Sequence, residues 1–147
     1  MSDKLQQLRA PFPDHQISYL PKGGANLAYV GHAALTNRLL DTDPAWNWEP
    51  LAMTPDGLPV IDNLGGMWIK LTIGGVTRLG YGDAQGKTGG DAMKERIGDA
   101  LRNAAMRFGA ALDLWHKGDL HGDDEGEKPK VTTPTQKPAA QTPKDRA

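Results

Sequence analysis

The sequence contains no cysteine among its 147 residues. This absence excludes a disulfide framework and a thiolate metal site, and it favours a protein of a reducing compartment. No apolar run approaches the roughly 18 to 20 residues that cross a bilayer, and the first residues lack the apolar core of a signal peptide. We therefore expect a soluble, cytoplasmic protein.

The residue patterns of common enzyme sites are also missing. The four histidines form no close ligand pair and no HExxH motif; they are His15, His32, His116 and His121. There is no serine nucleophile elbow, and the paired carboxylates fall in expected turns or in the C-terminal segment. We therefore predict a protein that is not an enzyme and that uses no metal and no cofactor.

A glycine-rich segment over residues 82–88 partly resembles a phosphate-binding loop, because Gly86, Lys87 and Thr88 precede an expected helix. The full P-loop pattern requires a glycine at position 81, which is Tyr81 here, so a nucleotide triphosphatase is disfavoured. Backbone amides, the Lys87 ammonium and the positive end of a helix still favour an anion at this place.

Length and composition predict one ordered domain over residues 1–117 and a tail over residues 118–147. The tail is rich in charged residues, proline, threonine and glutamine and has almost no large apolar residue. Such a segment buries too little apolar surface to offset the entropy of ordering. We expect it to be disordered.

Apolar periodicity predicts an α+β fold for the ordered part. A short polar helix is expected at residues 4–9, an extended run at 16–20 and a helix at 29–40. Strands are expected at 46–53, 67–73 and 76–81, where the pair Gly74 and Gly75 is typical of a two-residue hairpin turn. The result is a three-stranded antiparallel meander whose polar face presents Lys70, Thr72 and Arg78.

The strongest pattern lies in residues 91–115, where apolar residues recur at helical spacing. This helix is expected to hold to the sheet through Met93, Ile97, Leu101, Ala104, Ala105, Phe108, Leu112 and Trp115. Over residues 63–107 there are seven Lys and Arg against four Asp and Glu, a formal charge of +3. The net charge of the whole chain is only −1, so the basic character is local.

These cations have two interpretations. In the first they are ordinary surface charges: Arg102 pairs with Asp99 at helical spacing and Lys94 is solvated. In the second they line a groove between helix and sheet that follows a phosphate backbone without reading its sequence. Arg107 favours the second interpretation, because it stands beside the core residue Phe108, where solubility alone requires no charge.

The order of these elements resembles the annealing domain of the Rad52-type single-strand annealing proteins, a family that includes phage recombinases. The resemblance covers residues 16–117. It is carried by Tyr29, Gly31 and His32 at the start of the first helix, by Gly80, Tyr81 and Gly82 at the end of the meander, and by the basic helix from Lys94 to Gly109.

The resemblance implies a β-β-β-α core that assembles side by side into a ring of roughly ten or eleven subunits. Single-stranded DNA would lie in a groove around the ring, with Arg102 at an inner site and Lys87 at an outer one. The sequence departs from the family where a basic residue is usual, at Ala33, Asn103 and Met106, and Arg107 stands one place along. The resulting DNA-binding set is Lys22, Lys70, Arg78, Lys87, Lys94, Arg102 and Arg107.

The leading hypothesis is a protein that binds single-stranded DNA and promotes ATP-independent annealing in homologous recombination or double-strand break repair. If the gene belongs to a phage, the protein works in the cytoplasm of the bacterial host. The alternative is a non-enzymatic scaffold that recruits a replication or repair protein through the tail. No membrane partner is expected under either hypothesis.

Overall fold

The computed structural model describes residues 3–22 and 24–115 of the chain. The predicted tail at 118–147, together with His116 and His121, lies outside the described residues. The described part of the chain divides into two compact units: residues 3–11 with Gly31–Ala110, and the described residues of 12–30 with residues 111–115. Among the described helices, none has the length and apolar character needed to cross a membrane.

The larger unit is built on an antiparallel sheet of three strands, β3 (Asn47–Pro50), β4 (Gly66–Ile73) and β5 (Val76–Asp83), in that order. The predicted meander and the α+β class are therefore confirmed. The predicted hairpin turn is also confirmed, because Gly74 (φ 56) and Gly75 (φ 80) join β4 to β5 in the left-handed region that glycine adopts freely. β3 is shorter than predicted and ends at its proline.

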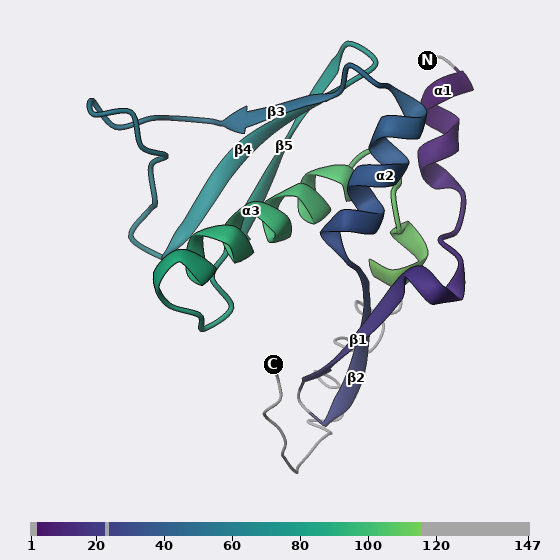
Figure 1. Ribbon diagram of the computed structural model, residues 1–147, viewed down its shortest axis with the longest axis horizontal. Helices are drawn as coiled ribbons and strands as arrows, with labels where there is room; N and C mark the ends of the chain where they lie inside the picture. The colour runs from purple at the N-terminus through teal and green to yellow at the C-terminus, as the bar shows by residue number, and fades with distance from the viewer. Residues whose placement is uncertain (1–2, 23, 116–147) are drawn as a thin grey trace, which may run out of the picture. The chain divides into compact units, whose positions relative to one another are not determined.

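The long helix α3 (Gly89–Met106) crosses one face of this sheet (Figure 1). Residues paired directly across antiparallel strands share a face, so the alternation along β4 decides which side chains meet the helix. The core face carries four side chains of β4 that are almost inaccessible to solvent: Met67, Ile69, Leu71 and Ile73. The other face carries the intervening residues, which remain partly exposed.

Two glycines of β5 set how closely α3 approaches the sheet. A Cβ atom at Gly80 would lie 2.5 Å from the carbonyl oxygen of Ala100, and one at Gly82 would overlap the backbone amide of the same residue. Any larger residue at either position would push the helix away. Tyr81, between them, points to the opposite face, which gives the Gly-Tyr-Gly sequence a physical reason.

The predicted helix over residues 91–115 is wrong at its C-terminal end, because α3 stops at Met106. Gly109 adopts φ 100, and the amide of Ala110 donates to the carbonyl of Ala105 at 3.1 Å. This is the Schellman pattern, in which a left-handed glycine lets the chain satisfy the last helical carbonyls and turn away. The chain beyond Ala110 belongs to the other unit.

The buried face of α3 also differs from the predicted apolar stripe. Met93 and Ile97 are only half-buried. The buried positions of α3 are Ala92, Gly98, Ala100, Leu101, Ala104 and Ala105. Helix and sheet therefore meet through small side chains, as the glycines of β5 require.

Helix α2 (His32–Thr42) completes the larger unit together with α1 (Asp3–Gln6) and a 3-10 turn at Gln7–Arg9. The short helix predicted at residues 4–9 is confirmed by the last two elements. Arg38 of α2 holds the 3-10 turn, because its Nη1 atom donates to the carbonyl of Ala10 at 2.7 Å. Leu8, Leu35 and Leu39 are almost fully buried.

The smaller unit contains a two-stranded antiparallel hairpin, β1 (Ile17–Lys22) and β2 (Ala25–Val30). The extended run predicted at 16–20 is confirmed as part of β1. The helix predicted at 29–40 begins too early, because Tyr29 belongs to β2. Gly31 has the extended dihedrals φ −68 and ψ 156, so the helical conformation starts only at the next residue.

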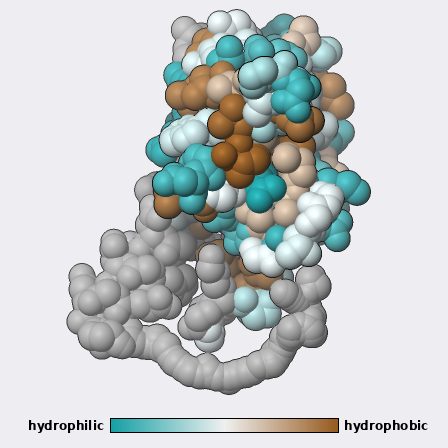
Figure 2. All heavy atoms as spheres, turned by 90° about the vertical axis from the view of Figure 1, so that its left-hand side faces the viewer, coloured by the Kyte–Doolittle hydropathy of each residue, from teal (hydrophilic) through white to brown (hydrophobic). Residues whose placement is uncertain are grey.

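Between β3 and β4 the chain runs out beyond the sheet and returns (Figure 1). We call residues 51–65 the arm. It is held by internal hydrogen bonds, such as Val60 N to Ala52 O at 3.0 Å and Leu58 N to Thr54 Oγ1 at 3.1 Å. Hydrophobic residues gather in the middle of the side of the molecule where the arm lies (Figure 2). The exposed apolar residues of the arm are Leu51, Met53, Leu58, Val60 and Leu64.

Candidate nucleic-acid interface

Two of the predicted DNA-binding cations pair with the same residue of α3, Glu95. Lys87 Nζ lies 2.8 Å from Glu95 Oε1, and Arg102 Nη2 lies 3.2 Å from Glu95 Oε2. The same Arg102 atom lies 3.6 Å from Asp99 Oδ1. We call Lys87, Glu95, Asp99 and Arg102 the charge cluster. The pairing of Arg102 with Asp99, expected from helical spacing, is confirmed.

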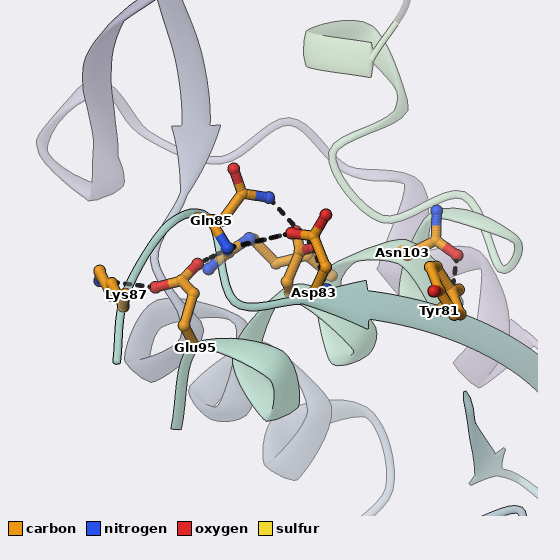
Figure 3. A network of polar contacts seen from close by, with 8 residues as sticks. Tyr81, Asp83, Gln85, Lys87, Glu95 and Asn103 are labelled. Carbon is orange, nitrogen blue, oxygen red and sulfur yellow. Dashed lines mark hydrogen bonds and ion pairs between the residues drawn. The ribbon is translucent and has the colours of Figure 1, made fainter. Parts of the chain in front are cut away.

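Hydrogen bonds from the preceding loop shape the charge cluster (Figure 3). Asp99 Oδ2 accepts from the backbone amide of Asp83 at 3.1 Å and from Gln85 Nε2 at 3.3 Å. Gln85 has φ 52, which is a left-handed backbone conformation. Its backbone amide supports this conformation by donating to Asp83 Oδ1. These bonds hold the loop against α3 and so fix the position of the Lys87 backbone.

The members of the charge cluster differ in exposure. The side chain of Lys87 is 48% exposed, whereas those of Arg102 and Glu95 are 16% and 19% exposed. Ion pairs that reach solvent contribute only about 0–1 kcal/mol each, because water screens them. Lys87, whose side chain is the most exposed of the three, can therefore change partners at low energetic cost.

Arg78 does not lie on the polar face with Lys70, as the sequence predicted. It pairs with Leu71 across the sheet and therefore points to the core face. There its guanidinium carbon lies 4.8 Å from the ring centre of Phe108, and its Nη1 donates to the carbonyl of Arg107 at 2.7 Å. Arg78 thus caps the end of α3, because a cation near the last helical carbonyls is favourable.

The remaining predicted cations are spread over the chain. Lys70 lies on the face of the sheet opposite α3, where it pairs with Glu49 at 3.7 Å. Lys94 and Arg107 have exposed side chains on and just after α3. Lys22 closes β1 in the smaller unit, and its side chain lies outside what the structure describes. Of the seven predicted residues, the structure therefore brings together Lys87 and Arg102.

Sequence reasoning missed the central role of Glu95. Glu95, Asp99 and Arg102 follow one another at intervals of four and three, so they share one face of α3. That spacing is visible in the sequence and predicts the pairs within the helix. The pairing of Glu95 with Lys87 spans a loop, and it depends on how the chain turns from β5 into α3.

Asn103, where the resembled family usually has a basic residue, has a structural role here. Its Oδ1 accepts from the backbone amide of Tyr81 at 3.0 Å and so fastens α3 to β5 (Figure 3). Arg96 is likewise structural, because its Nε donates to the carbonyl of Gly65 at 2.9 Å and anchors the arm. Neither contact is recognisable from residue spacing.

On the opposite face of the sheet, Tyr81 and Asp62 join the arm to β5. The hydroxyl of Tyr81 donates to the Asp62 carboxylate, at 2.9 Å from Oδ2. The amide of Gly66 donates to the same carboxylate at 2.9 Å, and this bond is the main cause that lowers the pKa of Asp62. Partial burial and the bond to Asp62 raise the pKa of Tyr81. The ring centres of Trp68 and Tyr81 lie 4.9 Å apart.

Comparison with known proteins finds no matching family model. It does find two proteins named single-stranded DNA-binding protein DdrA, from Deinococcus deserti and Deinococcus radiodurans. Each is 30% identical to this chain in an alignment of 124 positions that covers 78% of the chain. This chain is therefore similar to DdrA. It spans 58% and 56% of the length of these two relatives.

The names of the relatives describe binding to single-stranded DNA and no reaction. The similarity to DdrA does not test the resemblance to the Rad52-type family, so membership of that family stays a prediction. Chemically, a cluster of two cations and two carboxylates at the surface can exchange one anionic partner for another. It offers the charge-assisted hydrogen bonds that phosphate oxygens accept.

Proposed function

We propose that this protein binds single-stranded DNA and promotes annealing of complementary strands without ATP, as part of recombination or double-strand break repair. The observation that carries the proposal is the juxtaposition of Lys87 and Arg102 at α3, in a chain similar to proteins named for binding single-stranded DNA. The Rad52-type resemblance supports the finer step from binding to annealing. Under this proposal the protein is not an enzyme.

The mechanism rests on phosphate neutralisation. Cations of the charge cluster bind successive phosphates and release condensed counterions, so that affinity falls as salt rises. Contacts to the backbone leave the base edges free, and a second strand can pair with them. Because the contacts read no base, the protein binds any sequence and the two strands themselves supply the specificity.

One copy of the charge cluster offers few phosphate contacts, so we propose that affinity comes from assembly into a ring. Many linked sites raise the overall affinity far above that of one site. Two features support contact between copies. Within the described sheet, β3 and β5 are edge strands, and the arm exposes apolar side chains, of which Leu64 is 81% exposed.

The test is the double substitution Lys87→Ala with Arg102→Ala. Each lost contact removes one charge-assisted hydrogen bond, worth about 1.5–3 kcal/mol, so affinity for a fluorescent oligo-dT should fall at least tenfold. The dependence of log affinity on log salt should flatten by about 0.7 for each lost phosphate contact. Annealing of two complementary labelled oligonucleotides, measured without ATP, should slow in parallel.

Lys4→Ala is the matched control, since it removes one exposed cation from α1, outside the predicted DNA-binding set. It should leave affinity within about twofold of the unsubstituted protein. Thermal unfolding of both variants shows whether they remain folded. If the folded double variant binds and anneals as well as the unsubstituted protein, the proposed interface is wrong. If the unsubstituted protein binds oligo-dT but never anneals, the annealing step is wrong.

A further inference from the structure

The carboxylate of Glu95 occupies an unusual place, since each of its two oxygens meets a different cation. Oε1 lies 2.8 Å from Lys87 Nζ, and Oε2 lies 3.2 Å from Arg102 Nη2. The two non-bridging oxygens of a phosphodiester have the same ability to accept from two separate donors. The carboxylate therefore stands where a backbone phosphate would bind most strongly.

Glu95 and Asp99 are not equivalent, although both approach Arg102. Asp99 also accepts from the Asp83 amide and from Gln85, so it holds the loop in shape. Within the described part of the chain, the polar contacts of the Glu95 carboxylate are those with Lys87 and Arg102. Displacing Glu95 leaves the loop hydrogen bonds in place, whereas displacing Asp99 would break them.

Charge makes Glu95 a competitor of phosphate. The charge cluster contains two cations and two anions, so its formal charge is zero while Glu95 stays in place. An attached carboxylate has a high effective concentration at the site, and a phosphate must displace it to bind. The displaced side chain is 19% exposed and sits beside the more open Lys87, so it can swing towards solvent.

We propose that Lys87 and Arg102 form a phosphodiester-binding subsite that Glu95 fills in the free protein, and that Glu95 thereby limits affinity for single-stranded DNA. This inference rests on the proposed function. Filling the subsite keeps the two cations positioned near each other without mutual repulsion. The two cations are then already in position for a phosphate of the DNA, which must displace the Glu95 carboxylate in each subunit to bind.

The substitution Glu95→Gln tests this inference, because glutamine keeps the size and removes the charge. Affinity for fluorescent oligo-dT at fixed salt should rise three- to tenfold, and the salt dependence should steepen by up to about 0.7 per additional phosphate contact. Glu49→Gln is the matched control. It makes the same change in net charge beside Lys70, on the opposite face of the sheet, and should change affinity by less than twofold.

A double-mutant cycle shows whether a gain in affinity comes from releasing Lys87 and Arg102 or only from the loss of one negative charge. In a Lys87→Ala, Arg102→Ala background, Glu95→Gln should give no gain, since the cations that it would release are absent. The inference is overturned if Glu95→Gln binds as tightly as or more weakly than the unsubstituted protein, or if the gain persists without the two cations. If the unsubstituted protein fails to bind oligo-dT, the proposed function is wrong, and this inference, which rests on it, is wrong as well.

Discussion

The close approach of α3 to β5 leads to a sharp prediction for Gly80→Ala. The new methyl group would lie 2.5 Å from both the carbonyl oxygen of Ala100 and the Cβ of Ala104, and 2.6 Å from the amide nitrogen of Ala104. Ordinary van der Waals contacts begin at 3.4 Å, so the gap must widen by 0.9 Å. Two of the three atoms belong to helix backbone, which cannot rotate away as a side chain can.

The cost follows from that displacement. Overpacking against a close-packed neighbour costs about 1–3 kcal/mol and sometimes more. A gap of 0.5–1 Å along the rest of the interface loses a quarter to a half of each van der Waals contact. In the opposite direction, alanine restricts the unfolded chain more than glycine does, which stabilises the folded state by about 0.4–1 kcal/mol. We therefore expect Gly80→Ala to lower the free energy of unfolding by about 2–4 kcal/mol.

Urea unfolding at fixed protein concentration measures this effect. With a slope of about 2 kcal/mol per molar, the midpoint should fall by about 1–2 M while the slope stays unchanged. Gly90→Ala is the control, because Gly90 lies in α3 with no atom within 4 Å of the added methyl group. That change should be neutral or stabilise by up to about 1 kcal/mol. Equal midpoints for the two variants would refute the account of helix packing given above.

Two further predictions concern the sheet. The pKa of Asp62 is lowered below its ordinary value of 3.8, mainly by the Gly66 amide. The ionised Asp62 carboxylate therefore stabilises the fold above pH 3.8, and this contribution is lost as the pH falls through the lower folded-state pKa. When unfolding is measured from neutral pH to below pH 3.8, the free energy of unfolding should fall less steeply with acid for Asp62→Asn than for the unsubstituted protein. An equally steep fall in both proteins would contradict this prediction. Ile69 is fully buried, so Ile69→Ala should cost about 2–5 kcal/mol in the same urea experiment; a loss below about 1 kcal/mol would mean that the core face of the sheet is wrongly assigned.

The parts of the fold that were predicted correctly have local causes. The alternation of residues 67–73 and the Gly74-Gly75 pair determine strands and a turn through backbone preferences that neighbouring residues satisfy among themselves. The helix prediction was correct over most of α3 for the same reason. It went wrong at Gly109, because apolar spacing continues past a glycine that ends the helix.

Other elements were missed because their patterns are ambiguous. β2 is a short, largely apolar run, and such a run fits a strand or the first turn of a helix equally well. Arg78 was assigned to the polar face from its charge, although its strand register places it on the core face. There the ring of Phe108 and a helical carbonyl compensate for its burial.

By itself, the sequence determined the α+β class, the meander, the basic helix and the candidacy of Lys87 and Arg102, since each depends on residues near one another in the chain. Only the tertiary structure decided which of the seven cations meet and that Glu95 stands between two of them. It also showed why glycines flank Tyr81. The physical reason is that side-chain neighbours across α3, β5 and their connecting loop are set by packing distance and strand register, which no local pattern encodes.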